Sequence, residues 1–116
     1  MSKLIDFYYG IGPDAAGRRI DDVWEWDDDE LEEVHDYIQW LFPTATPSAY
    51  HTAAPVLTDE DVATFAASDI LRSRLRLSFL RFLRFVGLAL AQDEQVVEGP
   101  NFGERCPEIW TYENHN

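Results

Sequence analysis

The sequence is poor in cysteine, in basic residues and in long apolar runs. Its single thiol, Cys106, allows neither an internal disulfide nor a thiolate metal cluster, which is compatible with a reducing compartment. No window approaches the roughly eighteen apolar residues of a membrane span, and the N-terminus has no signal-peptide pattern. We therefore expect a cytoplasmic protein with no membrane span and no cofactor.

Basic residues number only nine against 22 Asp and Glu, which gives a formal charge of -13. Such a charge repels a phosphate backbone, so nucleic-acid binding is disfavoured. A helical projection spreads the clustered arginines around most of a cylinder, so we expect them to pair with carboxylates within the fold and on its surface. The cluster consists of Arg72, Arg74, Arg76, Arg81 and Arg84.

Apolar residues, in contrast, are abundant enough for a core. The 116 residues are 46% hydrophobic and 14% aromatic, which excludes intrinsic disorder and fits one domain over residues 1–116. The N-terminal segment KLIDFYY has helical spacing, with Ser2 as its cap and Gly10 at its end. The following segment, GIGPDAAGRR, has the turn residues of a loop but neither the strand context nor the lysine of a phosphate-binding loop.

An acidic segment precedes the second predicted helix, over residues 28–42. Aspartates 27–29 suit a helix N-terminus, where unpaired amides attract negative charge. An apolar stripe follows at helical spacing, and Trp40 projects to nearly the opposite side of it. The stripe consists of Leu31, Val34, His35, Ile38, Leu41 and Phe42.

Two further helices are predicted after an extended connection that contains Pro43 and Pro47. Thr58 and Asp61 resemble a capping box, so a helix is expected over 59–67. Its residues Val62, Phe65 and Ala66 are expected to face inward.

The longest helix, over 69–90, has apolar residues on more than one side, which predicts that it is a central rod covered by neighbours. Gly87 is expected to mark a close contact. Residues 92–107 have the composition of a loop, and QVVEG supports at most an isolated strand pair. The predicted fold is therefore all-α, with about four helices around a central arginine-rich helix and with Pro-rich and C-terminal loops.

Catalytic and metal-binding patterns are weak. His35 lies among carboxylates on the apolar stripe, but packing with one satisfied hydrogen bond is the favoured interpretation of a single histidine. No HxxxH or ExxH spacing supports a metal centre, and the acidic run lacks the glycine of a calcium loop. A small hydrolase or transferase that uses His35 with Glu32 or Asp36 is kept as the alternative to a non-enzymatic protein.

The segment LEEVHDYIQWLFP resembles the opioid growth factor receptor conserved region, whose most recognisable feature is an LExxHxYIQWLFP segment. The resemblance covers nearly the whole chain, and departures include His51 in place of an Asn. Its supporting residues are Asp14 and Gly17, Ile20 and Trp24, Ser48, Ala54, Pro55, Leu57 and Thr58, Ser78, Phe79, Leu83, Phe85 and Gly87, and Trp110 with Asn114, His115 and Asn116.

This resemblance implies an all-α, non-enzymatic binding or regulatory module, in a family with a member known as a receptor for an enkephalin peptide. Two interpretations of the aromatic residues stay open. Tyr37 and Trp40 pack inside the fold, or Tyr37, Trp40, Tyr50 and His51 line a groove for a peptide or protein partner. Burial distinguishes these interpretations, because full enclosure of Trp40 argues against the groove.

The resemblance also implies further helices after Asn116. Without them, a homodimer is expected to cover apolar side chains that would otherwise be exposed. These are Leu77, Leu80, Leu88 and Trp110.

Overall fold

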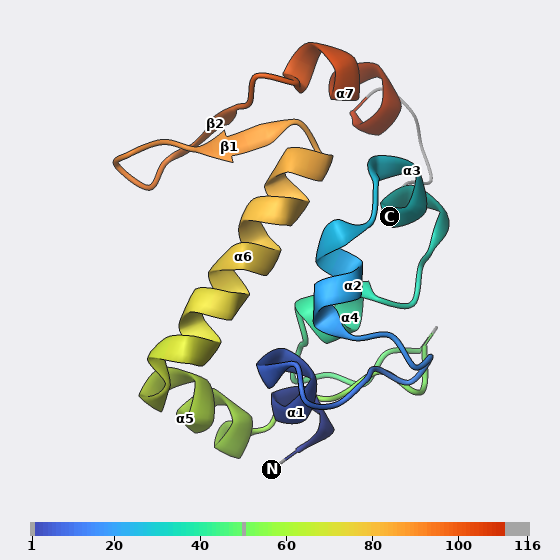
Figure 1. Cartoon of the computed structure of the whole chain (residues 1–116), viewed down its shortest axis with the longest axis vertical. Coiled ribbons are helices and arrows are strands. Elements are labelled where there is room, and N and C mark those ends of the chain that lie inside the picture. The colour runs from blue at the N-terminus through green and yellow to red at the C-terminus, as the bar shows by residue number, and fades with distance from the viewer. Residues whose placement is uncertain (1, 50, 111–116) are drawn as a thin grey trace. The chain divides into compact units, whose positions relative to one another are not determined.

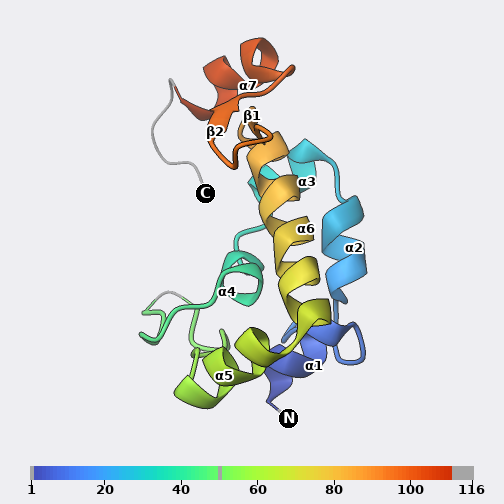
Figure 2. The same ribbon diagram turned by 90° about the vertical axis from the view of Figure 1, so that its left-hand side faces the viewer.

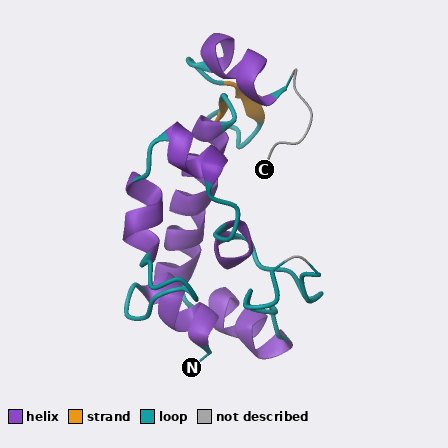
Figure 3. Ribbon diagram, turned by 90° about the vertical axis from the view of Figure 1, so that its right-hand side faces the viewer, coloured by secondary structure: helices purple, strands orange, loops and turns teal. Residues whose placement is uncertain are grey.

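The computed structural model describes residues 2–49 and 51–110, which form two compact units, one over Met1–Arg76 and one over Leu77–Asn116. Helices dominate both units (Figures 1 and 3). The elements, in chain order, are α1 (Lys3–Tyr9), α2 (Ile20–Glu25), α3 (Asp28–Glu33), α4 (Ile38–Leu41), α5 (Asp59–Ala67), α6 (Asp69–Phe85), β1 (Leu88–Leu90), β2 (Val96–Glu98) and α7 (Phe102–Ile109). Among the described residues, none of the helices is both long enough and apolar enough to cross a membrane.

Helix α1 begins and ends where the sequence predicts. The Ser2 hydroxyl accepts a hydrogen bond from the Ile5 amide at 3.2 Å, and Gly10 ends the helix in the left-handed conformation at φ +81°. The helix contributes four buried side chains to the core of the first unit, Leu4, Ile5, Phe7 and Tyr8. Tyr8 donates its hydroxyl proton to the Leu41 carbonyl at 2.7 Å, which ties α1 to the end of α4.

The predicted continuous helix over 28–42 is wrong. Helix α3 ends at Glu33, since Val34 is extended (φ -88°, ψ 131°), and α4 starts only at Ile38. The helical spacing of the apolar residues continued across this break, so periodicity alone did not reveal it. The break places Trp40 in the core, where it is 3% exposed, although a continuous helix would have turned it away. Sequence analysis also missed α2.

Helix α5 has the capping box that the sequence predicts, with Thr58 and Asp61 bonding each other's backbone amides. It lies along α1 (Figure 2), and two hydrogen bonds join the helices: Ser2 donates to Asp61 at 2.7 Å, and the hydroxyls of Tyr9 and Ser68 are 3.0 Å apart. The predicted inward direction of α5 side chains is wrong for Val62 (51% exposed) and for Ala66, and Phe65 is half-buried.

Helix α6 is shorter than predicted, because it ends at Phe85 and not near residue 90. Leu71 and Phe85 are buried, whereas Leu77 and Leu80 are exposed. The prediction that neighbouring elements cover α6 on more than one side is therefore wrong for these two leucines. As predicted, arginines of this helix pair with carboxylates: Arg72 binds Asp69, and Arg74 binds Asp21 of α2 at 3.2 Å.

The second unit corrects the all-α prediction. Strands β1 and β2 form an antiparallel hairpin in the register Leu88 to Glu98, and α7 occupies much of the segment predicted as loop. Three side chains that follow the hairpin donate hydrogen bonds to carbonyls at the end of α6 or directly after it: Asn101 to Arg84 (2.8 Å), Arg105 to Phe85 (2.8 Å), and Trp110 to Val86 (2.9 Å). The last carbonyls of a helix lack intrahelical donors, and these side chains supply donors to them, alongside the Gly87 amide that also bonds Arg84 at 3.2 Å.

Gly87 explains why the chain turns so closely beneath α7. Its φ is +85°, and a Cβ atom there would lie 3.2 Å from the Phe102 Cα and 3.0 Å from the Arg105 Cβ. The expected close contact at Gly87 is therefore confirmed.

Candidate functional site

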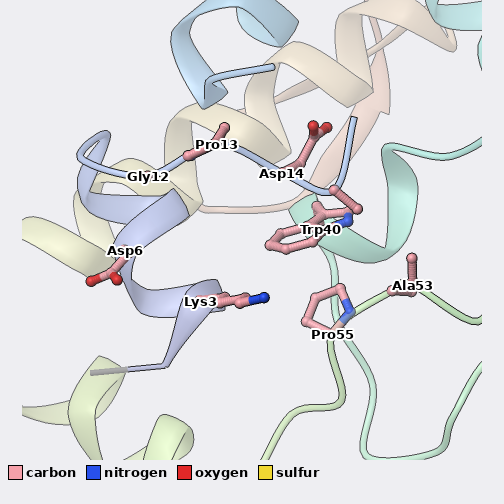
Figure 4. Close-up of a pocket in the computed structure, with 10 residues that line it drawn as sticks. Lys3, Asp6, Gly12, Pro13, Asp14, Trp40, Ala53 and Pro55 are labelled. Carbon is pink, nitrogen blue, oxygen red and sulfur yellow. The ribbon is translucent and has the colours of Figure 1, made fainter. Parts of the chain in front are cut away.

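The first unit contains a pocket of about 660 Å³, which we call the Trp40 pocket. Helix α1 contributes Lys3 and Asp6, and α4 contributes Trp40. Two segments without regular structure, residues 12–15 and 53–55, complete its wall (Figure 4). Most of the side chains that line the pocket are apolar and belong to proline, alanine and tryptophan residues.

The segment 12–15 is held by a polar cluster behind the pocket wall. The buried Asp14 carboxylate accepts hydrogen bonds from the amides of Ala16 and Arg18, both at 2.9 Å, and from Arg18 Nε at 2.8 Å. Arg18 also binds Asp36 at 2.7 Å and lies over the Trp26 ring. Burial alone lowers the pKa of Arg18, but its hydrogen bonds and charge interactions with both aspartates outweigh burial, so the net pKa shift is upward.

Asp14 therefore shapes the pocket without offering its carboxylate to a ligand. Its side chain points away from the pocket in Figure 4, and its oxygens are occupied by the neighbouring loop. The role of this residue is to hold the backbone of residues 12–15 in place.

Trp40 forms a rigid part of the wall. Its ring packs against Phe7 with centroids 5.2 Å apart. Its indole N–H is buried and has no hydrogen-bond acceptor among the described residues. A buried indole N–H is ordinarily paired, so this donor is a distinctive polar feature of the wall.

Lys3 supplies the positive charge of the pocket. Figure 4 shows its side chain extending towards Trp40 and Pro55, while the Asp6 carboxylate points in the opposite direction. No carboxylate of the described residues forms an ion pair with Lys3. Lys3 is exposed, and two carboxylates, those of Asp6 and Asp14, line the same pocket. An ammonium group without an ion pair among the described residues is the cationic feature of the site.

The described members of the predicted group, Tyr37, Trp40 and His51, lie in different surroundings. Of the three grouped residues that the structure describes, Trp40 alone lines the Trp40 pocket. Tyr37 is fully buried, and its hydroxyl donates to the Leu31 carbonyl at 2.6 Å, which favours the packing interpretation for this residue. His51 is half-buried, and Tyr50 lies outside the described residues, as do residues 114–116. Binding by the four residues stays a prediction.

Sequence reasoning missed Lys3 and the prolines of the pocket. The available signal was that Lys3 is the sole lysine of the chain, but nothing in the sequence placed it beside Trp40. Burial of Trp40, which is 3% exposed, argues against an open aromatic groove, because its ring offers little surface to a ligand even though it lines the pocket.

His35 differs from its predicted environment. It is exposed between α3 and α4, and it has no hydrogen bond or ion pair within the described part of the chain. Asp36, one of its two suggested carboxylate partners, binds Arg18 instead. No group of three or more His, Cys, Asp and Glu side chains among residues 2–49 and 51–110 has the arrangement of a metal site.

A second pocket of the first unit, of about 330 Å³, is lined by apolar side chains alone, including Phe42, Leu57 and Val62. It offers contact area but no charge or hydrogen bond for orienting a ligand. The Trp40 pocket combines both, which makes it the better candidate for specific binding.

The first unit is thus a compact helix-rich fold with a largely apolar pocket, lined by one lysine and two aspartates. The chain belongs to the family described as the opioid growth factor receptor (OGFr) conserved region, which it matches over residues 6–116. The resemblance seen in the sequence is confirmed.

Three relatives are proteins named opioid growth factor receptor. Those of Mus musculus and Rattus norvegicus are 34% identical over 105 residues, which cover 86% of this chain and 16% and 18% of the relatives, respectively. The protein of Homo sapiens is 39% identical over 74 residues, or 61% of this chain and 11% of that relative. The chain therefore spans less than a fifth of the length of these relatives. No solved structure matches it significantly.

Proposed function

We propose that the chain is a non-enzymatic binding module that holds a peptide segment in the Trp40 pocket. The observation that carries this proposal is a largely apolar pocket into which Lys3 extends, with no ion pair to Lys3 among the residues that the structure describes. The names of the relatives support a receptor-like role, since they are called receptors of a growth factor.

The size of the pocket suits this function. A volume of about 660 Å³ falls in the range of roughly 300–1,000 Å³ that is typical of ligand sites. Proline and tryptophan walls lose little conformational entropy on binding, so contact area there translates efficiently into affinity. The Asp14 and Arg18 cluster keeps the wall preorganised.

A non-enzymatic role fits the surroundings of His35. A general base needs a partner that orients its ring, and His35 is exposed with no such partner among the described residues. No observation favours the alternative of a hydrolase or transferase. The expected homodimer stays a prediction for light scattering, with the exposed Leu77, Leu80 and Trp110 as its candidate contacts.

Nuclear magnetic resonance of the ¹⁵N-labelled chain tests the binding proposal directly. The indole N–H signals of the four tryptophans are assigned with Trp→Phe variants, and the enkephalin peptide that the resemblance implies is added up to about one millimolar, a weak-binding concentration. We expect the Trp40 signal to shift progressively. The Trp110 signal serves as the control, because its N–H is bonded to Val86 in the second unit. An unchanged Trp40 signal would refute binding of this peptide at the pocket.

A further inference from the structure

We propose that the second pocket of the first unit, which we call the α5 groove, is a docking site for an amphipathic helix of a partner protein, with an apolar face flanked by Lys or Arg. This surface is separate from the Trp40 pocket, so the proposal does not rest on peptide binding there. It depends on three features of the groove: accessible apolar side chains, a lining without hydrogen-bonding side chains, and carboxylates on its rim. The groove is lined by Phe42, Pro43, Leu57, Val62, Phe65 and Leu75.

The α5 groove offers apolar surface that a ligand can reach. Val62 of α5 is 51% exposed, Leu75 of α6 is 36% exposed, and the other four lining side chains are half-buried. All six belong to the first unit, where the segment after α4, the residue before α5, α5 itself and the first turns of α6 supply them (Figure 2). Its volume of about 330 Å³ is near the lower end of the range for ligand sites, which suits a few anchoring side chains.

Contacts within the first unit hold the walls of the α5 groove in place. The Phe65 ring packs edge-to-face against the buried Tyr8 ring, with centroids 5.2 Å apart. The Leu57 amide donates to the Thr44 carbonyl at 2.8 Å, which joins the two segments that supply Pro43 and Leu57. The groove is therefore formed before a partner arrives, and this lowers the entropy cost of binding.

The lack of polar groups in the lining selects a helix as the ligand. Among the described residues, all six that line the groove have apolar side chains, and the Leu57 amide is already bonded. An extended peptide would bury its own amides and carbonyls here without partners, which is unfavourable for each unpaired group. A helix bonds these groups internally and presents only side chains, as amphipathic helices do in hydrophobic grooves.

The rim of the α5 groove selects basic residues in the partner. Asp59 and Glu60 begin α5 and are exposed, and Asp59 lies one helical turn before Val62 on the same side of the helix. Neither carboxylate forms an ion pair within the described part of the chain. Arg72 of the adjoining helix does not neutralise them, because it is bound to Asp69. Lys or Arg beside the apolar face of a partner helix would complement this rim.

Two libraries of displayed peptides test this inference with the 116-residue chain. Both consist of alanine-rich peptides of about 18 residues, or roughly five helical turns. They have Leu, Ile, Met or Phe on one face and Lys, Glu or Gln at the flanking positions. In the second library, two central alanines are replaced by proline, which breaks the helix. Fluorescence sorting with the labelled chain enriches binders, and fluorescence anisotropy measures the affinity of the most enriched peptide.

The wild-type chain should enrich helical peptides with Lys beside the apolar face and should retain few proline peptides. Val62→Gln and Leu75→Gln should each weaken binding about five- to tenfold, because they place an amide in the apolar groove. Both residues are partly exposed, so these variants should keep the wild-type circular dichroism spectrum. Ile70→Gln is the matched control, since Ile70 is 62% exposed in the same unit but does not line the groove. Its affinity should stay within about twofold of wild type.

Charge substitutions separate the rim from the overall charge of the chain. Asp59→Asn combined with Glu60→Gln should weaken binding about two- to fivefold at low salt, and the loss should shrink as salt is added. Asp29→Asn combined with Glu30→Gln makes the same chemical change in the first turn of α3, which does not line the groove. This control should weaken binding less.

Equal affinity of the selected peptide for the wild-type, Val62→Gln and Leu75→Gln chains would overturn the inference, because the peptide would then occupy another surface. Equal enrichment of the proline library would overturn the assignment of a helix, and equal enrichment of Glu and Lys would overturn the assignment of charge. A wild-type dimer in light scattering that Val62→Gln dissociates would assign the groove to a second copy of the chain instead. Failure of both libraries to yield a binder would refute docking at this groove, and would leave the Trp40 resonance experiment unaffected.

Discussion

Removal of the Tyr8 hydroxyl is the most direct test of how the first unit is held together. Tyr8 is fully buried, and its hydroxyl donates to the Leu41 carbonyl at 2.7 Å. Leu41 is the last residue of α4, so no amide of a following helical turn is available to that carbonyl. Tyr8→Phe keeps the ring and removes only this bond.

The expected cost follows from the burial of the acceptor. Leaving a buried carbonyl without its donor lowers the free energy of unfolding by about 1–3 kcal/mol. This free energy falls by roughly 1–3 kcal/mol per molar urea in small domains, so the urea midpoint should fall by about 1 M. Tyr9→Phe is the matched control at the adjacent position. Its hydroxyl meets the Ser68 hydroxyl at 3.0 Å in a half-buried place where water can substitute, so its cost should stay below about 0.5 kcal/mol.

Urea unfolding followed by tryptophan fluorescence measures both variants, since Trp24, Trp26 and Trp40 all belong to the first unit. Equal midpoints for Tyr8→Phe and the wild-type chain would refute the reasoning, because the bond to Leu41 would then contribute nothing that water does not replace. Equal losses for Tyr8→Phe and Tyr9→Phe would refute the claim that burial sets the difference.

Two further substitutions test other parts of the structure. Gly87→Ala should cost at least about 1 kcal/mol more than Gly17→Ala in thermal unfolding. Both glycines have positive φ, but only Gly87 is crowded by the backbone of α7, so equal losses would contradict that contact. Asp14→Asn should lower stability by about 1–3 kcal/mol, because it removes a buried charge paired with Arg18; an unchanged melting temperature would show that the pair does not hold the loop.

Local signals in the sequence were sufficient to predict helix ends. Ser2, Gly10 and the box of Thr58 and Asp61 act through contacts within a few residues, so they are visible without knowledge of the tertiary structure. The break at Val34 was not visible, because the apolar residues on both sides keep helical spacing while tertiary packing decides where the chain leaves the helix.

The pocket was beyond sequence reasoning for a related reason. Trp40 was identified as unusual, but its partner Lys3 lies 37 residues earlier in the chain and Pro55 lies 15 residues later. Composition shows that lysine is rare, yet only the fold shows that Lys3 extends towards Trp40 and Pro55. The same holds for α7, because Gly, Pro and Asn at its start are typical of a loop. Only the fold shows that Asn101 and Arg105 bond the carbonyls at the end of α6.

The two hydrogen bonds between α1 and α5 have a consequence for synthesis on the ribosome. Ser2 and Asp61 are separated by 59 positions, and so are Tyr9 and Ser68. At about 5–20 residues per second, translation needs roughly 3–12 s to proceed from one partner to the other, far longer than a helix takes to form. The α5 partners of α1 therefore exist only seconds after α1 has emerged, and until then the Tyr8 ring lacks its contact with Phe65.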